Sequence, residues 1–205
     1  MRSGQTTFVL RAANGRDEPL LTILCIAAKV RYHSVVRKNW ENLITLRVYQ
    51  SEDRTWVEES NVRFYRAVHN FDATFAVAVN SALDLLERQK SLVDSLYLVA
   101  EAEKQPVGCI FLCAETPAAG RIRLFYLEEE YRGRGIGLRL LRTVVSAAKD
   151  MKLKTVRVST FDRHPEACRL YETFGFESVK TAPSTDFSQV MKQVDYELLL
   201  GGSDL

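Results

Sequence analysis

The pattern of hydrophobic and polar positions becomes regular after the first forty residues. Residues 43–50 alternate as a strand does, and residues 51–68 show a helical spacing with Ser51 or Asp53 as the cap. A second amphipathic helix is predicted over residues 71–89. Its apolar face holds Phe71, Phe75, Val77 or Val79, Ala82, Leu85 and Leu86.

Alternating strands and helices fill the rest of the chain. Two apolar runs flank Pro106, which predicts a hairpin with this proline at its turn, and a third strand follows. The pattern then predicts a helix that ends near Met151, a strand, a short helix from Pro165 and two closing strands. This order predicts an α/β fold with a mixed sheet, in which a hairpin-rich half precedes crossover units. The predicted strands after the second helix cover residues 95–103, 107–115, 121–130, 155–161, 176–181 and 193–200.

The first forty residues follow a different pattern. Leu20 to Ala28 form an apolar stretch behind a basic start, which is superficially similar to the core of a secretory signal. A charged turn directly precedes it and no clear small-residue cleavage site follows, so we favour a helix packed on the core or on a partner. No apolar run approaches the roughly 20 residues that a membrane helix needs. We therefore expect an N-terminal extension of unclear, partly helical fold over residues 1–40 and a main domain over residues 41–205.

Composition limits the classes of function. With 205 residues, 46% of them hydrophobic, the chain can bury one core and carry an appendage. The net charge of +2 argues against a general nucleic-acid binder, so any anion must be bound by local clustering of basic residues. The cysteines form no C-x-x-C pair and the histidines have no metal-ligand spacing. We expect no metal site and a cytoplasmic protein with free, buried thiols at Cys25, Cys109, Cys113 and Cys168.

The most informative stretch is a glycine-rich, basic corner within residues 131–151. Gly133, Gly135 and Gly137 lie among arginines and lead directly into a helical pattern. The first turn of a helix offers unpaired N–H groups and the positive end of the helix dipole, which attract a phosphate. Glycines let the phosphate approach closely and permit positive φ in the loop. The alternative is a glycine-rich turn with a solvated basic face and no ligand. The arginines are Arg132, Arg134, Arg139 and Arg142, and the packing stripe of the helix is Leu140, Leu141, Val144, Val145, Ala148 and Met151.

Two other phosphate-binding loops fail on spacing. A dinucleotide fingerprint requires G-x-G-x-x-G, but Leu138 occupies the third glycine position. A Walker loop requires G-x-x-x-x-G-K-[ST], and no lysine or hydroxyl follows these glycines. What remains is R-x-x-G-x-G, formed by Arg132, Gly135 and Gly137.

A second group of informative residues, 159–177, follows the next predicted strand. Pro165 suits the first position of a helix with His164 as its cap, and Gly175 suits the position just after the helix ends. Tyr171 lies one or two turns into this helix. The helix therefore has a defined start and a defined end in the sequence.

The two stretches together resemble the GNAT superfamily of acetyl-CoA-dependent N-acetyltransferases. In that family R/Q-x-x-G-x-G/A opens the cofactor-binding helix, and N-x-x-A-x-x-L-Y-E-x-x-G-F follows. The resemblance covers roughly residues 43–200. Residues 46–75 look like the opening strand and helices, and residues 185–200 like the closing strands, of a bacterial subgroup that is often fused to MarR-type regulators. It implies a mixed, mostly antiparallel central sheet flanked by helices, with splayed strands that form the acyl-CoA cleft. The first motif is complete, and the second is present as Ala167, Leu170, Tyr171, Glu172, Gly175 and Phe176, with His164 in place of the asparagine.

The resemblance also implies how acetyl-CoA is held. The pantetheine arm hydrogen-bonds the backbone of Tyr126, Leu127 and Glu128, on the strand before the glycine corner. His164 takes the place of an asparagine that often contacts the cofactor, and a histidine that only caps its helix is the alternative. The pyrophosphate is held by the N–H groups of Arg132, Gly133, Arg134, Gly135, Ile136, Gly137 and Leu138.

The reaction implied by the resemblance is direct attack of a neutral amine on the thioester. The protein must then deprotonate an ammonium and protonate a departing thiolate. Tyr171 is the candidate general acid, and Glu128 is the candidate base, acting directly or through water. The alternatives are a core-packing tyrosine and a solvated acidic edge over residues 128–130.

Two functions are compatible with these features. The first is an N-acetyltransferase that uses acetyl-CoA and an amine on a small molecule, peptide or protein. The second is a non-catalytic acyl-CoA-binding or regulatory module that acts through a protein partner, motivated by His164 and by the unassigned first forty residues. We expect no nucleic-acid or membrane partner. Homodimers are frequent in the family, so a homodimer is one expected assembly.

Overall fold

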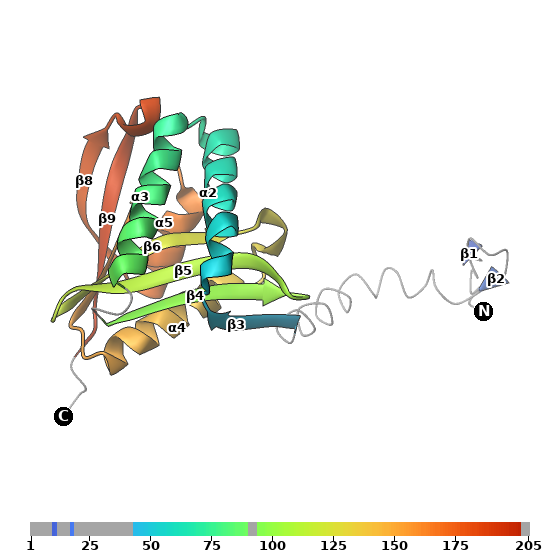
Figure 1. Cartoon of the computed structure of the whole chain (residues 1–205), viewed down its shortest axis with the longest axis horizontal. Coiled ribbons are helices and arrows are strands. Elements are labelled where there is room, and N and C mark those ends of the chain that lie inside the picture. The colour runs from blue at the N-terminus through green and yellow to red at the C-terminus, as the bar shows by residue number, and fades with distance from the viewer. Residues whose placement is uncertain (1–9, 12–16, 19–42, 90–93, 202–205) are drawn as a thin grey trace, which may run out of the picture. The chain divides into compact units, whose positions relative to one another are not determined.

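The computed structural model describes residues 10–11, 17–18, 43–89 and 94–201. The chain divides into two units between residues 43 and 44. In the first unit the described residues are a short antiparallel pair, β1 (Leu10–Arg11) and β2 (Asp17–Glu18). The second unit holds the sheet and the helices (Figure 1). The helix predicted from Leu20 to Ala28 lies outside the described residues.

Seven strands of the second unit form one sheet. Their order is β3-β4-β5-β6-β7-β9-β8, and every neighbouring pair is antiparallel except β6 and β7. The predicted α/β class with a mixed, mostly antiparallel sheet is confirmed. The strands are β3 (Ile44–Val48), β4 (Ser95–Ala102), β5 (Gln105–Thr116), β6 (Ala119–Leu127), β7 (Thr155–Phe161), β8 (Glu177–Ser184) and β9 (Met191–Leu199).

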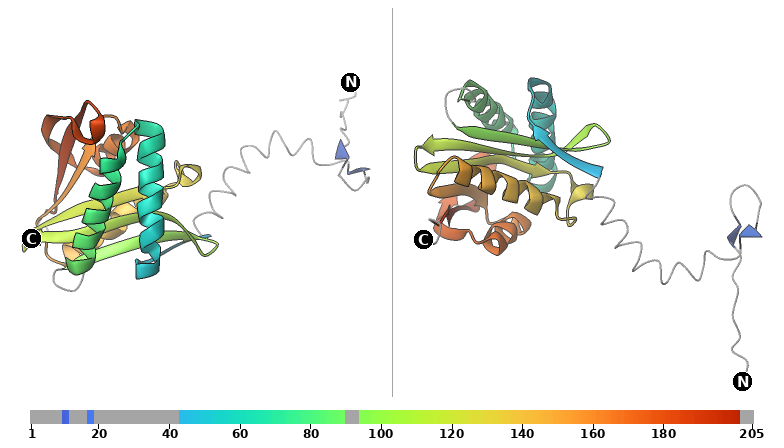
Figure 2. Two further views of the ribbon diagram at one scale, coloured as in Figure 1. Left: turned by 45° about the horizontal axis from the view of Figure 1, so that its top comes forward. Right: turned by 90° about the horizontal axis from the view of Figure 1, so that it is seen from below.

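Helices cover both faces of this sheet. α2 (Arg54–His69) and α3 (Ala73–Gln89) lie side by side on one face, and α4 (Ile136–Asp150) lies on the other (Figure 2). α5 (Pro165–Phe174) packs against β7 and β8. The strands and helices of the second unit follow one another in the predicted order.

The core forms because the middle of the sheet is apolar on both faces. Every residue of β5 from Val107 to Cys113 is buried, so alternate side chains face α4 on one side and α2 and α3 on the other. On the second side, the ring of Tyr97 stacks on Phe111 with 4.7 Å between centroids, and Tyr49 meets the same ring edge-on at 5.0 Å. On the first side α4 buries most of its predicted stripe, namely Leu140, Leu141, Val144, Val145 and Ala148.

The predicted position of Pro106 is wrong. The β4–β5 turn consists of Glu103 and Lys104, which both have positive φ, as two-residue hairpin turns require. Pro106 lies inside β5 opposite Glu101, at a shift in the strand register. A proline has no N–H group to donate, and a register shift is one of the few places where a strand accepts it.

The predicted apolar face of α3 is only partly correct. Val79 and Leu86 are buried as expected, but Leu85 is 40% exposed and Val77 is 66% exposed. Leu83, which was not on the predicted face, is fully buried. Positions 79, 83 and 86 are four and three residues apart and therefore share one side of the helix.

A buried carboxylate joins β3 to the start of α2. Asp53 is 6% exposed and accepts hydrogen bonds from Arg47 at 2.7 and 2.8 Å and from the Gln50 N–H at 2.9 Å. Burial by itself raises the pKa of Asp53, but the bonds from Arg47 and Gln50 outweigh it, and the pKa lies below its ordinary value. Asp53 occupies the predicted cap position, yet its side chain does not bond the first turn of α2. Ser51 opens a separate 3₁₀ turn, η1 (Ser51–Asp53).

We predict that Asp53→Asn lowers the free energy of unfolding by about 2 kcal/mol, because it weakens charged hydrogen bonds that are largely buried. The matched control is Asp84→Asn, which removes an exposed partner of Arg54 and costs less than about 1 kcal/mol. Urea unfolding at pH 7 measures both changes. Equal losses in the two variants contradict this assignment.

The same carboxylate predicts a pH dependence. The pKa of Asp53 in the folded protein is lower than the ordinary value of 3.8, so its stabilising effect is present above that pH and is lost as the pH falls further. The difference in stability between the wild type and Asp53→Asn is therefore expected to shrink below about pH 4. Urea unfolding repeated between pH 7 and pH 3 tests this, and a constant difference contradicts it.

Candidate functional site

The strands β6 and β7 separate halfway along their length. They pair in parallel from Ala119 and Thr155 as far as Ile122 and Val158, and the described residues beyond that point form no β6–β7 pairs. Leu124, with a φ of 47°, lies where the register between β6 and β5 shifts. Such a bulge bends its strand, and here the bend accompanies the separation from β7. The predicted splayed strands are therefore present.

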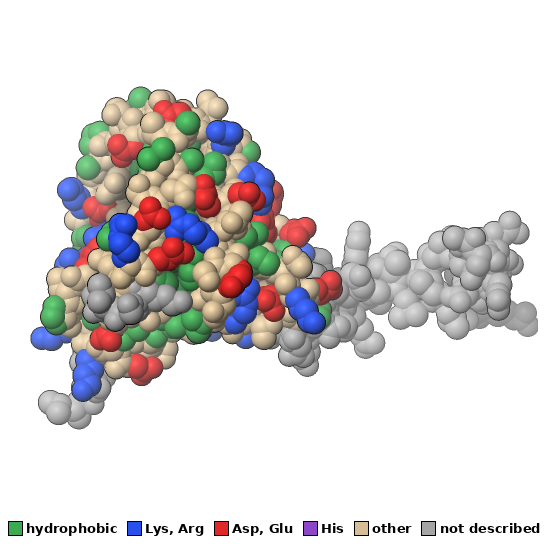
Figure 3. Space-filling model, viewed as in Figure 1, with side chains coloured by type: hydrophobic (Ala, Val, Ile, Leu, Met, Phe, Trp, Pro, Cys, Tyr) green, Lys and Arg blue, Asp and Glu red, His purple; other side chains and the backbone are tan. Residues whose placement is uncertain are grey.

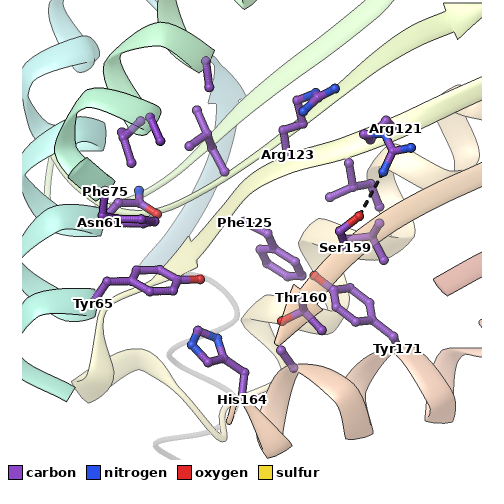
Figure 4. Close-up of a pocket in the computed structure, with 17 residues that line it drawn as sticks. Asn61, Tyr65, Phe75, Arg121, Arg123, Phe125, Ser159, Thr160, His164 and Tyr171 are labelled. Carbon is purple, nitrogen blue, oxygen red and sulfur yellow. Dashed lines mark hydrogen bonds between the residues drawn. The ribbon is translucent and has the colours of Figure 1, made fainter. Parts of the chain in front are cut away.

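A cavity of about 270 Å³ lies where the two strands separate (Figure 4). Side chains from β6, β7, α2, α3 and α5 line it. The hydroxyl groups of Tyr65, on α2, and Tyr171, on α5, both point into it. The tertiary fold therefore brings together polar groups that are far apart in the sequence.

Tyr171 combines a buried ring with an available hydroxyl. The residue is 3% exposed, and its ring packs against Phe125, Phe176 and Tyr196. Burial, together with the nearby Tyr65, raises the pKa of the Tyr171 hydroxyl, so the group is protonated at neutral pH. No described residue forms a hydrogen bond with this hydroxyl, which leaves its proton available to a molecule in the cavity.

His164 lines the same cavity at the start of α5. Its imidazole stacks on His69 with 4.1 Å between ring centroids, and its buried Nε2 has no partner among the described residues. Burial, with the charges of His69 and Arg132, lowers the pKa of His164 to about 4, so the ring is neutral at pH 7. His164 occupies the backbone cap position of α5, but the alternative of a side-chain cap is wrong, because the imidazole makes no capping bond.

Glu128 follows the last residue of β6 and is not among the residues that line the cavity. Its Oε1 accepts a hydrogen bond from Arg63 at 2.7 Å, and its Oε2 accepts one from the Tyr126 hydroxyl at 2.8 Å. Its backbone N–H donates to the Val107 carbonyl at 2.9 Å. Each oxygen of an ionised carboxylate has a second lone-pair site, so these two bonds do not prevent a role as base. Tyr126 and Leu127 precede Glu128 on the part of β6 that has left β7.

The glycine corner joins β6 to α4 through the turn η2 (Glu129–Tyr131). Gly133 and Gly135 have φ of 69° and 81°, and no heavy atom lies within 4 Å of the position of a Cβ at either residue. Gly135 is the cap residue of α4, whose first N–H groups, from Ile136 onward, have no acceptor within the helix. Open space beside the first turn of a helix is the arrangement that a pyrophosphate requires.

The arginines of the corner also hold the fold together. Arg132 donates from Nε to the Leu127 carbonyl at 2.9 Å, and its guanidinium lies 4.5 Å from the centroid of the Phe64 ring. Arg139 donates to the Ile44 carbonyl of β3 at 2.8 Å. These two side chains therefore fix the corner to its neighbours in addition to supplying positive charge.

Six polar residues of the cavity were missed from the sequence: Asn61, Tyr65, Arg121, Arg123, Ser159 and Thr160. Asn61 and Tyr65 are four residues apart, and this spacing places them on one side of α2, a signal that was present in the sequence. The two arginines alternate along β6, but no motif marks them. Whether these two arginines line a cavity depends on the positions of β7 and the helices.

Other candidate chemistry is limited. Among the described residues, no helix is long and apolar enough to cross a membrane, and no group of three His, Cys, Asp or Glu side chains could hold a metal. Cys109, Cys113 and Cys168 carry free thiols, of which the first two are buried, and Cys25 lies outside the described residues. Acidic and basic side chains are interspersed on the face shown in Figure 3.

Residues 93–178 match the family model of the acetyltransferase (GNAT) domain. Human N-acetyltransferase 8B is 33% identical over 99 residues, which are 46% of this chain and 44% of that protein. The spermine/spermidine N(1)-acetyltransferase of Bacillus subtilis (strain 168) is 34% identical over 61 residues, which are 28% of this chain and 40% of that protein. The structure of yncA from Salmonella typhimurium with its cofactor acetyl-CoA has a TM-score of 0.64 at 17% identity, over 79% of this chain and 96% of that chain.

These likenesses support a GNAT acetyltransferase domain in this chain, and the structural match shows its fold. The glycine corner and α5 both lie within the matched residues. The chain spans less than half the length of the two relatives found by sequence.

We predict that Gly135→Ala lowers the free energy of unfolding by about 1–2 kcal/mol, because a side chain at a φ of 81° is strained even where space is open. Gly137→Ala is the matched control. Its Cβ would make ordinary contacts at 3.7 Å with Leu170 and Phe125, and alanine is favoured over glycine in a helix by about 0.5–1 kcal/mol. We expect the control to be neutral or stabilising in urea unfolding. A similar loss in both variants contradicts the argument from φ.

Proposed function

We propose that this protein transfers the acetyl group of acetyl-CoA to the amine of an acceptor molecule. The observation that carries the proposal is the cavity at the separation of β6 from β7. The hydroxyl of Tyr171, which bonds no described residue, points into this cavity. The open glycine corner at the start of α4 and the match to the GNAT domain support it.

In this proposal, backbone groups hold most of the acetyl-CoA. The pantetheine arm bonds the backbone of Tyr126, Leu127 and Glu128, at the end of β6 that has left β7. His164, whose Nε2 is free among the described residues, is available to contact the same molecule in the cavity. The pyrophosphate lies on the N–H groups of Arg132, Gly133, Arg134, Gly135, Ile136, Gly137 and Leu138.

The acceptor amine attacks the carbonyl carbon of the thioester. A C–N bond forms, the C–S bond breaks, the nitrogen loses a proton and the departing thiolate gains one. Tyr171 is the proposed proton donor to the sulfur, because its raised pKa keeps the hydroxyl protonated. Glu128 is the proposed base for the ammonium, directly or through water. His164 is neutral at pH 7 and therefore does not repel an incoming ammonium.

The finer expectations from the sequence remain predictions. They are an acceptor on a small molecule, peptide or protein, a homodimer, a cytoplasmic location, and the likeness to the bacterial subgroup often fused to MarR-type regulators. The division into residues 1–40 and 41–205 is also a prediction. A relative named for spermine and spermidine makes small amines the first acceptors to test.

Binding is tested by thermal unfolding with acetyl-CoA. We predict that millimolar acetyl-CoA raises the Tm of the wild type and of Gly137→Ala. Gly135→Val is expected to abolish this shift, because a β-branched residue at positive φ distorts the corner that holds the pyrophosphate. Absence of a shift in the wild type rejects the proposal.

Catalysis is tested with Tyr171→Phe in an assay of CoA thiol release across a panel of amines. We predict that kcat falls by about 100-fold or more, which is the usual contribution of a general acid. The Tm is expected to stay within a few degrees of the wild type, because the hydroxyl makes no bond to a described residue. Tyr196→Phe is the control, since Tyr196 bonds Glu172 at 2.8 Å beside Tyr171 but does not line the cavity.

The alternative, a non-catalytic acyl-CoA-binding or regulatory module, predicts a different outcome. It requires that acetyl-CoA binds but that no amine releases its thiol, and that Tyr171→Phe changes nothing. Thiol release by the wild type that Tyr171→Phe abolishes rejects this alternative.

A further inference from the structure

The charged side chains that line the cavity all have the same sign. Arg121 and Arg123 line its β6 wall, and its lining residues, all of them described, include no aspartate or glutamate. His164 is neutral at pH 7, because its pKa is about 4. The other polar groups are hydroxyls and the amide of Asn61. Arg121 and Arg123 therefore give the lining of the cavity a positive charge (Figure 4).

One carboxylate bonds both of these arginines. Glu115, on β5, accepts hydrogen bonds at the same oxygen, Oε1, from Arg121 Nε at 2.6 Å and from Arg123 Nη2 at 3.0 Å. Arg121 also donates from Nη1 to Ser159 Oγ at 3.0 Å. Two arginines and one glutamate leave one positive charge. Glu115 therefore orients both guanidinium groups and offsets only one of their two positive charges.

Two nitrogens of Arg123 form no hydrogen bond with the described residues. Its Nη2 bonds Glu115, whereas its Nε and Nη1 form no hydrogen bond with any described residue. The side chain is 38% exposed, so a molecule that enters the cavity can reach it. A guanidinium presents its N–H groups in a planar fork that matches the two oxygens of a carboxylate.

We propose that the acceptor is a small amine that also carries a carboxylate, with the carboxylate bound by Arg123 and the amine directed toward Tyr171. This inference rests on the proposed acetyl transfer. A cavity of about 270 Å³ admits a molecule of amino-acid size, near the lower limit of small-molecule sites. A diamine or polyamine places a second ammonium beside Arg121 and Arg123, where like charge and the lack of a lining carboxylate disfavour it.

The test compares acceptors of matched length that differ at the far end, such as 4-aminobutyrate with 1,4-diaminobutane and 6-aminohexanoate with 1,6-diaminohexane. The assay follows CoA thiol release from acetyl-CoA. We expect kcat/KM for at least one amino acid to exceed that of its diamine by about 10-fold or more, as a charged hydrogen bond provides. Arg123→Gln is expected to remove this preference, mainly by raising the KM of the amino acid, and to leave the diamines unchanged or improved.

The matched control is Arg66→Gln. Arg66 is exposed on α2 and does not line the cavity, so the variant removes the same charge elsewhere and leaves both kinds of acceptor unchanged. A preference of the wild type for diamines overturns the inference while acetyl transfer itself stands. An equal loss for both kinds of acceptor in Arg123→Gln overturns it as well.

Calorimetric binding of the same amino acids to the CoA-loaded protein provides a readout that does not need turnover. Binding that Arg123→Gln weakens by about 10-fold, without thiol release, supports the carboxylate site and rejects the proposed transfer. If the amino acids neither bind nor react, the inference is wrong. Thermal unfolding of Arg123→Gln shows whether the variant is folded, and Arg123→Lys, which keeps the charge, is expected to retain part of the preference.

Discussion

The bulge at Leu124 is the constraint on which the site depends. A parallel pair that stayed hydrogen-bonded along its whole length would close the space in which the cavity lies. Leu124 adopts a positive φ, its carbonyl accepts a hydrogen bond from the Cys109 thiol at 3.0 Å, and the register against β5 shifts there. Beyond this point β6 pairs with β5 and with no other described strand, so α2 and α5 can bring Tyr65 and Tyr171 to the opening.

Burial around this opening decides which groups are charged. It raises the pKa of Tyr65 and of Tyr171 and lowers that of His164, so all three are neutral at pH 7. Charge remains in the first half of β6 and just after its end. Arg121 and Arg123 share Glu115 in the first half, and Arg63 bonds Glu128 just after the strand. The region between them is lined mainly by neutral groups, and the hydroxyls of Tyr65 and Tyr171 there form no hydrogen bond with a described residue.

Much of the fold follows from local rules. The apolar spacing of α4 matches its buried side, and Pro165 and Gly175 mark the start and the end of α5 as expected. Gly133 and Gly135 adopt the positive φ for which glycine is suited. The predictions are wrong where two local structures suit the same residue and long-range packing decides between them. Pro106 suits either a turn or a register shift. Leu85 suits the predicted apolar face of α3, but its side chain is exposed in the fold.

The sequence by itself determined the order of the strands and helices, the glycine corner and the tyrosine on α5, because each depends on residues within a few positions of one another. Only the tertiary structure decided that Tyr65, Arg121 and Arg123 share a cavity with Tyr171. These residues come from α2, β6 and α5. Their side chains lie close together because β6 separates from β7 and because the bulge in β6 sets the direction of its side chains. Strand pairing across the sheet sets that geometry, and no local pattern of residues encodes it.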